Sequence, residues 1–228
     1  MKLATKFLVG AAFSLAMASS AQAAVVTYIG ADNNVGNLAQ MTNSSAAAAA
    51  FDAVTAGATL VDFESALPAS LSIAGGSITN NSGCGALCGF NTTSGGQNFL
   101  SLFGGSATFN FTSAVNAFGF FVSGLQTNLV GQQTVTFSDG SQQVINFPSA
   151  VQGGNGGGGA FIGFTDFGKS ILSVTVNVSN DIVAIDDLRF GNIGAPVPEP
   201  ATWAMMIAGL GAVGYAMRRR RNIAVSFA

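Results

Sequence analysis

The sequence predicts an all-β fold, an antiparallel β-sandwich of jelly-roll type, on three observations. Apolar and polar residues alternate along many short segments, charged residues form only 8% of the chain, and 30 glycines provide frequent turns. Alternation with a period of two places one face of each strand in a core and the other in solvent. About nine or ten such segments at short, regular spacing favour two packed sheets over a helical fold.

The first expected elements are a strand, a short helix and a second strand. Residues 25–29 are β-branched and aromatic, which favours a strand. Ser44 and Ser45 can cap a helix over residues 46–54, where a run of alanines has high helix propensity but a small apolar face. We therefore expect one short surface helix packed loosely on the sheet, with a flexible alanine linker as the alternative. Residues 59–64 return to a strand pattern.

Residues 80–96 are rich in Asn, Gly and Ser, which predicts a loop after a hairpin-like pair of strands at 71–73 and 77–79. The loop carries Cys84 and Cys88, the two cysteines of the chain. Two close cysteines in an exported protein usually form a disulfide, and the export signals are given below. A metal or redox pair is the alternative, but no histidine or third cysteine completes a metal-binding set.

Asp139-Gly140 is the strongest short-range hairpin signal in the chain. Two registers are open there. A two-residue loop sets Val135 opposite Val144, and a three-residue loop sets Val135 opposite Ile145.

Residues 153–159 contain six glycines and predict a flexible loop, because glycine loses the most backbone entropy on ordering. Strand patterns cover most of the remaining sequence. The expected strands are 99–103, 107–112, 117–122, 134–137, 142–147, 160–164, 172–178 and 182–190.

The beginning of the chain has the pattern of a secretory signal peptide, residues 1–23. Lys2 and Lys6 supply positive charge, an apolar core follows, and Ala21 and Ala23 form a small-x-small cleavage site. The apolar core is too short for a membrane span. We therefore expect the secretory translocon and signal peptidase as partners, with cleavage after Ala23.

The other end of the chain has the pattern of a membrane segment. Residues 201–217 are uncharged and would form a helix of roughly 26 Å, near the hydrocarbon thickness of a bilayer, which predicts a single transmembrane helix. Trp203 suits the outer interface, and the arginines at 218–221 favour the cytoplasmic side, so the expected orientation is N-terminus out and C-terminus in. A short tail, residues 222–228, follows.

Segment 197–221 resembles the PEP-CTERM sorting signal in its Pro-Glu-Pro-x-x-Trp-Ala form. The resemblance implies a single-pass precursor, anchored transiently in the inner membrane, that an exosortase recognises and cuts. It further implies release to the periplasm, the cell surface or the extracellular space of a bacterium that makes exopolysaccharide. The residues that carry the resemblance are Pro198, Glu199, Pro200, Trp203, Arg218, Arg219, Arg220 and Arg221.

One domain, residues 24–196, lies between the two targeting segments. It keeps nine acidic residues and only two basic ones, Lys169 and Arg189, for a net charge near −7. Two basic residues cannot form the positive surface that nucleic acids require, so nucleic-acid partners are excluded. The chain has no histidine, which excludes Ser-His-Asp and Cys-His catalysis. Carboxylate chemistry is the class that stays open.

Four carboxylates form the candidate site: Asp62 and Glu64 on an early strand, and Asp186 and Asp187 on the last. The first and last strands of a sandwich can be neighbours, which would bring these groups together. The pattern resembles carbohydrate-binding jelly rolls, whose terminal strands often hold a structural calcium. The resemblance implies Glu64 and Asp187 as calcium ligands, with Asp62 or Asp186 as further candidates. The alternative is that Asp186 or Asp187 pairs with Arg189 or faces solvent.

Three functional hypotheses follow. The first is a non-enzymatic, exported cell-surface or extracellular-matrix protein associated with exopolysaccharide or biofilm. The second is a carbohydrate-binding module with structural calcium. The third is a carboxylate-based glycoside hydrolase, which needs two carboxylates about 5 to 10 Å apart in a cleft. The single tryptophan, Trp203, lies in the sorting segment, so the domain offers few aromatic platforms to a sugar.

Overall fold

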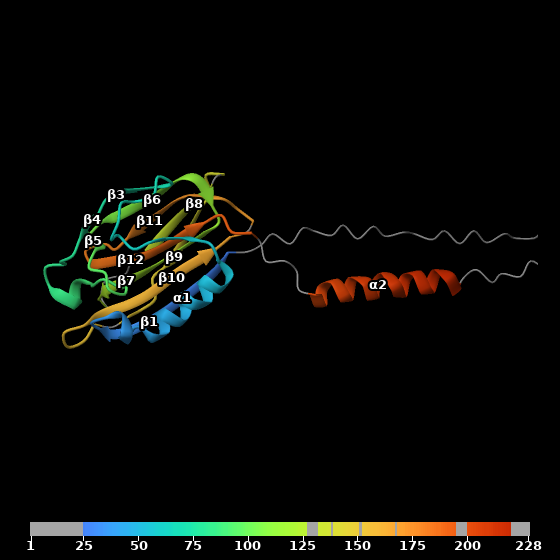
Figure 1. Ribbon diagram of the computed structural model, residues 1–228, viewed down its shortest axis with the longest axis horizontal. Coiled ribbons are helices and arrows are strands. Elements are labelled where there is room, and N and C mark those ends of the chain that lie inside the picture. Colours follow the sequence, from blue (N-terminus) through green and yellow to red (C-terminus); the bar gives the residue numbers. More distant parts are fainter. Residues whose placement is uncertain are drawn as a thin grey trace, which may run out of the picture.

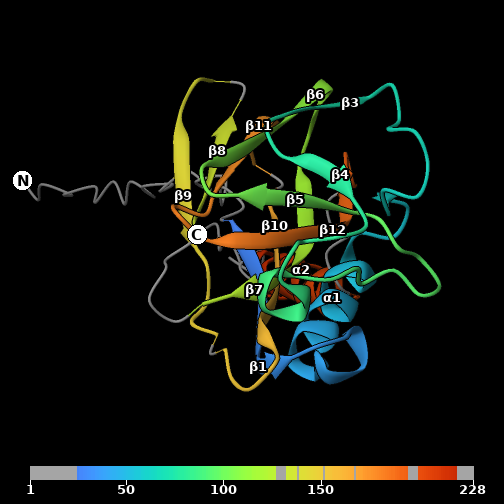
Figure 2. The same cartoon turned by 90° about the vertical axis from the view of Figure 1, so that its left-hand side faces the viewer.

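Two antiparallel sheets lie face to face and form a β-sandwich, as the sequence predicts (Figure 1). The computed structural model describes residues 25–126, 132–137, 139–150, 152–166, 168–194 and 200–219. The predicted signal peptide, residues 1–23, lies outside the described residues, as does the 222–228 tail. Figure 2 shows β5 and β12 side by side in one sheet, with β8 and β9 in the other.

The larger sheet has the strand order β1-β10-β7-β12-β5-β4, and a further short strand, β2, pairs with β12. The predicted neighbours are confirmed, because Val61 of β2 lies opposite Leu188 of β12, but β2 ends at Val61, so Asp62 and Glu64 follow the strand and do not lie on it as predicted. The strands are β1 (Val26–Val35), β2 (Thr59–Val61), β4 (Ser77–Thr79), β5 (Phe99–Phe103), β7 (Ala117–Leu125), β10 (Gly157–Thr165) and β12 (Ile182–Gly191).

The smaller sheet has the order β3-β6-β11-β8-β9, and its neighbours are also antiparallel. Its strands are β3 (Leu71–Ala74), β6 (Ser106–Val115), β8 (Gln132–Phe137), β9 (Gln142–Asn146) and β11 (Ile171–Asn177).

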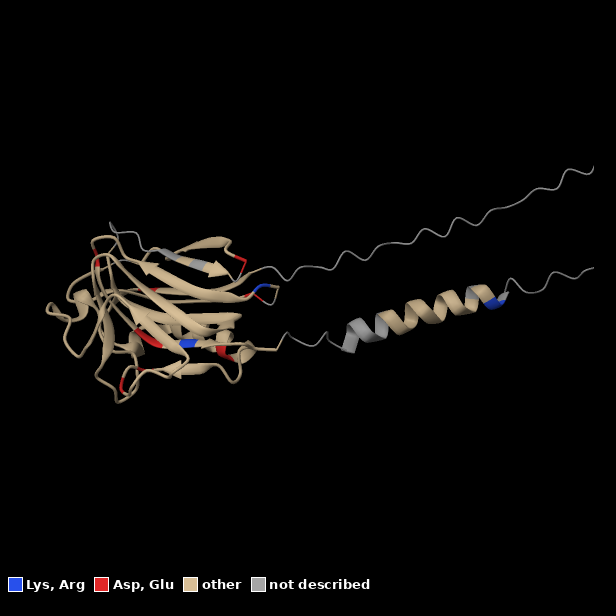
Figure 3. Ribbon diagram, turned by 90° about the horizontal axis from the view of Figure 1, so that it is seen from above, with Lys and Arg blue, Asp and Glu red and all other residues tan. Residues whose placement is uncertain are grey.

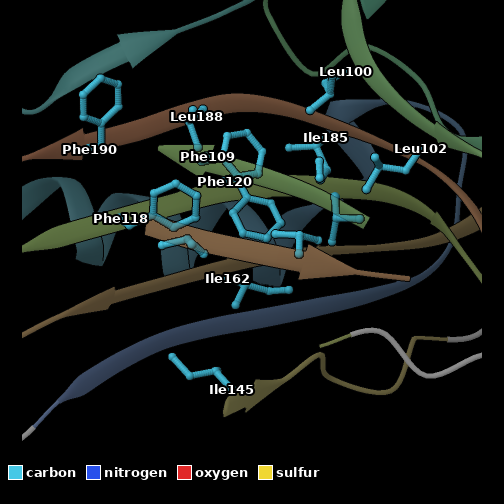
Figure 4. Packing of buried hydrophobic residues seen from close by; sticks show 14 of the residues in the cluster. Leu100, Leu102, Phe109, Phe118, Phe120, Ile145, Ile162, Ile185, Leu188 and Phe190 are labelled. Atoms are coloured by element: carbon cyan, nitrogen blue, oxygen red, sulfur yellow. The ribbon is translucent and has the colours of Figure 1, made fainter. Parts of the chain in front are cut away.

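The main core lies between the sheets and is rich in phenylalanine (Figure 4). Phe118 of β7 is fully buried and packs against the rings of Phe109 and Phe111 from the facing sheet, at centroid distances of 5.4 and 5.9 Å. Tilted and edge-on ring pairs of this kind add to the stabilisation that burial of apolar area provides. The alternating strands of the sequence thus close on one core.

Helix α1 (Thr42–Val54) covers the outer face of the larger sheet and makes a second core. The expectation of a loosely packed helix is wrong, because Phe51 is fully buried and lies 5.5 Å from Tyr28 and 5.7 Å from Phe161, ring to ring. The helix approaches the strand below it so closely that a Cβ at Gly30 would lie 2.2 Å from the carbonyl oxygen of Asn43. A short 3₁₀ turn, η1 (Leu38–Gln40), leads into it.

The cap of α1 also differs from the prediction. The helix begins at Thr42, before Ser44 and Ser45, and its capping carboxylate comes from Asp32 of β1. The Asp32 oxygens accept hydrogen bonds from the backbone N–H groups of Asn43 (3.0 Å) and Ser44 (2.8 Å). A carboxylate at a helix N-terminus satisfies donors that the helix itself cannot.

The glycine-rich segment is only partly a loop, and the prediction for residues 157–159 is wrong. Gly157–Gly159 begin β10 and are buried in the sheet. Neighbouring groups leave no room for a side chain: a Cβ would lie 2.6 Å from the Cα of Gly124 at Gly157, and 2.7 Å from the Met41 side chain at Gly159. Glycine in a strand here marks close approach of other chain segments.

Both registers predicted for the Asp139-Gly140 hairpin are wrong. Val135 lies opposite Gln143. The reason is that the backbone N–H of Phe137 donates to the carbonyl of Ser141 at 2.9 Å, so the register lies one residue from the first expectation and two residues from the second.

Helix α2 (Pro200–Arg219) agrees in position with the helix predicted for residues 201–217, and Figure 1 shows it as one continuous helix. Among the described residues, however, no helix combines the length and apolar character that crossing a membrane requires. Gly209, Gly211 and Gly214 and the hydroxyl of Tyr215 lower the apolar character of this segment. The transmembrane prediction is therefore not confirmed.

Candidate functional site

Three of the four predicted carboxylates, those of Glu64, Asp186 and Asp187, hold one loop, residues 91–98, through hydrogen bonds. Asp186 and Asp187 lie at an irregularity of β12, where its pairing with β7 shifts register and Asp187 adopts a positive φ of 47°. A bulge of this kind interrupts the strict alternation of a strand. Both residues are buried: Asp186 is 1% exposed and Asp187 is 7% exposed. Both carboxylates accept hydrogen bonds from Thr92 and Thr93.

Asp186 holds the backbone of Thr92 and Thr93. Its Oδ2 accepts hydrogen bonds from their N–H groups at 2.6 and 3.2 Å. The threonine hydroxyls reach Asp187, with Oγ1 of Thr92 3.1 Å from Oδ2 and Oγ1 of Thr93 2.9 Å from Oδ1. The carboxylate pair thus fixes this turn of the loop by main-chain and side-chain bonds together.

Glu64 holds the far end of the same loop. Its Oε1 accepts from the backbone N–H groups of Gln97 and Asn98, each at 2.6 Å, and its Oε2 accepts from the Asn98 side chain at 2.8 Å. Asp62 acts locally, because its Oδ1 accepts from the backbone N–H of Glu64 at 3.1 Å. The three residues Glu64, Asp186 and Asp187 therefore form, with loop 91–98, what we call the carboxylate clasp.

The pKa values at the two ends of the carboxylate clasp are shifted in opposite directions. Burial, together with the nearby charge of Asp187, raises the pKa of Asp186 to about 7. The backbone N–H of Asn98 and further donors from Gln97 lower the pKa of Glu64. Glu64 is therefore an anion at neutral pH, while Asp186 keeps its proton to a much higher pH than an ordinary carboxyl group does.

The hydrogen bonds of the carboxylate clasp bear on the predicted calcium site. Calcium needs several free oxygen ligands at about 2.3–2.6 Å. In the clasp, the oxygens of Asp186 and Glu64 already accept hydrogen bonds from N–H donors, which occupy the positions that a cation would need. Within the described ranges, no group of three or more acidic, cysteine or histidine side chains is arranged to hold a metal. This geometry does not favour calcium, and its binding stays an untested prediction.

Arg189 does not pair with the carboxylates of Asp186 or Asp187. Its Nε lies 2.8 Å from Oδ1 of Asp52 in α1, and its Nη1 donates to the backbone carbonyl of Asp187 at 2.6 Å. The guanidinium also lies over the rings of Phe121 and Phe161, at 5.4 and 5.6 Å from their centroids. It ties the helix to the sheet beside the clasp.

The loop before the clasp is fixed by several contacts of its own. Cys84 and Cys88 are joined in a disulfide across the short helix η2 (Gly85–Cys88). The backbone of Phe90 makes two hydrogen bonds with the hydroxyl of Ser123 in β7, at 2.9 and 3.0 Å. Gly89 lies so close to β12 that a Cβ there would be 2.4 Å from the Ala184 nitrogen.

The sequence predicted the carboxylates of the clasp but not the loop residues that donate hydrogen bonds to them. Thr92, Thr93, Gln97 and Asn98 carry no local signal, since the whole loop is rich in small polar residues. Their role depends on strand pairing about ninety residues away along the chain, at Asp186.

A family comparison matches residues 196–221 to the PEP-CTERM protein-sorting motif. No curated protein matches the chain. Among solved structures, TmCBM61, described in complex with β-1,4-galactotriose, is 13% identical; the match covers 57% of this chain and 94% of that one, with a TM-score of 0.36. A likeness this low carries no argument about function. Residues 196–221 of this chain are thus a PEP-CTERM protein-sorting motif.

Proposed function

We propose that this protein is an exported, non-enzymatic component of the cell surface or extracellular matrix, delivered by its PEP-CTERM motif. The observation that carries the proposal is the motif at residues 196–221, which implies export and sorting by an exosortase. In this proposal the motif holds the precursor transiently at the inner membrane, with the arginines at 218–221 on the cytoplasmic side and the sandwich outside. Cleavage near the motif releases the sandwich.

A non-enzymatic role is supported by the state of the acidic groups. Carboxylate chemistry is the class that the residue content leaves open, and it needs carboxylates that face a substrate. In the clasp, Asp186 and Asp187 are buried and bonded to threonines, and both oxygens of Glu64 accept donors from the loop. These groups hold structure, so we do not propose a glycoside hydrolase.

We also propose that the protein associates with exopolysaccharide, and the charge of the domain indicates whether that polysaccharide is neutral or anionic. Figure 3 shows scattered acidic residues and few basic ones on the sandwich. Lys169 and Arg189 are each engaged in an ion pair, with Asp139 and Asp52. An acidic domain repels anionic polymers, so neutral polysaccharide is the better partner.

Mass spectrometry of the protein secreted by an exosortase-containing host tests the sorting. We expect a chain that starts at Ala24 and has lost its C-terminal segment. A variant with Pro198→Ala and Pro200→Ala should stay in the membrane fraction with its C-terminus intact. The matched control, Pro148→Ala, changes a proline outside the motif and should be processed normally. An intact C-terminus on secreted wild-type protein would contradict the proposal.

A further inference from the structure

A cavity of about 360 Å³ opens beside the disulfide loop, at the end of the larger sheet. It is separate from the hydrogen bonds inside the clasp but shares one wall with them, through Asn91 and Gln97. Its volume lies within the range of roughly 300–1,000 Å³ that is usual for small-molecule sites. The side chains that give it chemical character are Asn80, Asn81, Ser82, Phe90, Asn91 and Gln97.

The polar groups around this pocket have unused hydrogen-bonding capacity. Asn80 and Gln97 are exposed, and their side-chain amides make no hydrogen bond within the described part of the chain. Asn91 uses its Nδ2 to donate to the Asn98 carbonyl at 2.6 Å and to Glu64, which leaves its Oδ1 as an acceptor. Each amide carries both a donor and an acceptor group, so the wall can bond hydroxyls in either direction.

The same wall is uncharged and partly aromatic. No Lys, Arg, Asp or Glu is among the described residues that line the pocket. Phe90, which is half-buried, and Phe99, which is buried, both line the pocket and give it an apolar part. Amides with an aromatic surface suit a ligand that has many hydroxyls and one apolar face. They suit neither phosphate nor a carboxylate, which need a cation or a helix N-terminus.

The pocket is built before any ligand arrives. The disulfide closes η2, Ser123 holds Phe90 from β7, and Glu64 holds the backbone at Gln97. Gly89 and Gly124 pack so tightly that a Cβ at Gly124 would lie 2.5 Å from the Gly89 nitrogen. A preformed site binds more tightly because little conformational entropy is lost on binding.

We propose that this pocket binds a neutral saccharide unit, with the amides of Asn80, Asn91 and Gln97 bonding ring hydroxyls and Phe90 lying against an apolar face of the ring. This inference rests on the proposed association with polysaccharide and names its site and ligand class. Nothing in it depends on a metal.

The test is calorimetric titration of the full chain in mild detergent with two sets of probes: neutral gluco-, galacto- and manno-oligosaccharides, and oligogalacturonate as the acidic comparison. We expect at least one neutral oligosaccharide to bind and oligogalacturonate not to bind. Replacing Asn80→Ala and Gln97→Ala together removes two amides and should weaken binding about tenfold or more. Both residues are exposed, so the variant should keep the wild-type melting temperature.

The matched control removes two exposed amides from the other sheet, Gln142→Ala and Asn146→Ala on β9, and should bind as the wild type does. Binding that survives the Asn80/Gln97 change would overturn the pocket assignment while leaving polysaccharide association in place. Preference for oligogalacturonate would overturn the neutral ligand class. No binding to any probe would overturn the inference, and the sorting proposal would still stand or fall on mass spectrometry alone.

Discussion

Asp186 shows how one buried side chain can make stability depend on pH in the opposite direction from most carboxylates. Burial raises its pKa to about 7, against 3.8 for the ordinary group. Its contribution to stability is complete below pH 3.8, where both folded and unfolded chains are protonated, and it is lost as the pH rises through 7. Asp181, whose pKa burial also raises, acts in the same direction.

We therefore expect the free energy of unfolding to fall by about 2 kcal/mol between pH 5 and pH 8 on account of Asp186. Asp186→Asn removes the titrating group and should flatten this dependence, and it should also lower stability at both pH values because its NH2 group would face a backbone N–H at one of the two oxygen positions. Urea unfolding at the two pH values measures both effects. Glu64, whose pKa is lowered, contributes stability above its ordinary pKa of 4.5 and loses it only at lower pH, so Glu64→Gln is the control that should keep the slope. An equal slope in Asp186→Asn and wild type would show that Asp186 is not the source.

The carboxylate clasp also leads to an expectation about metal. Because N–H donors occupy the Asp186 and Glu64 oxygens, we expect EDTA to leave the melting temperature unchanged. Thermal unfolding with EDTA and then with excess calcium is the measurement. A fall in melting temperature that calcium reverses would establish the predicted site, because a ligand that binds only the folded state stabilises it.

At the scale of elements, α1 shows what local sequence contains and what it omits. The alanine run predicts a helix, and a helix forms there. Its cap, Asp32, lies on β1 about ten residues earlier, and only the packing of helix on strand brings the two together. The serines that looked like caps lie inside the helix, and Ser44 instead donates to Asp32.

Replacing Asp32→Ala should lower the free energy of unfolding by about 2 kcal/mol, the upper end for loss of a helix cap. The loss is large because this carboxylate serves two backbone N–H groups and is buried. Ser45→Ala is the matched control, since the structure gives Ser45 no capping role, and it should change little. Urea unfolding of both variants decides, and a larger cost for Ser45→Ala would restore the cap predicted from sequence.

The glycines of β10 mark a second limit of reading elements from sequence. Gly157–Gly159 look like a loop because glycine is unfavourable in strands. Gly124 and Met41 lie so close to this strand that a side chain at Gly157 or Gly159 would collide with them, so only glycine fits at these two positions. Strand β11 needed no such context for its bounds, which were predicted within a residue, but a shift in its pairing between Ile171 and Ser173 leaves Leu172 exposed and interrupts the expected alternation.

At the scale of the whole molecule, the fold class was predictable and the order of strands was not. Alternation identifies strands one at a time, and burial of the phenylalanines then requires two facing sheets. Pairings such as β10 with both β1 and β7 join segments far apart in sequence, for which the sequence has no local signal. The same holds for the carboxylate clasp: the sequence predicted its acidic residues but not the loop that they hold.

The placement of Lys169 and Arg189, the two basic residues of the domain, affects how easily proteases outside the cell can cut the protein. Trypsin-like proteases cut only after lysine or arginine, and between the two targeting segments the chain offers Lys169 and Arg189. Arg189 lies in β12, between β2 and β7, with a side chain only 15% exposed, so a protease that binds extended chain cannot reach it without unfolding the sheet. Lys169, 39% exposed in the connection between β10 and β11, is then the one place where such an enzyme could begin. The folded sandwich should therefore resist secreted trypsin-like proteases, with Lys169 as the first position to be cut.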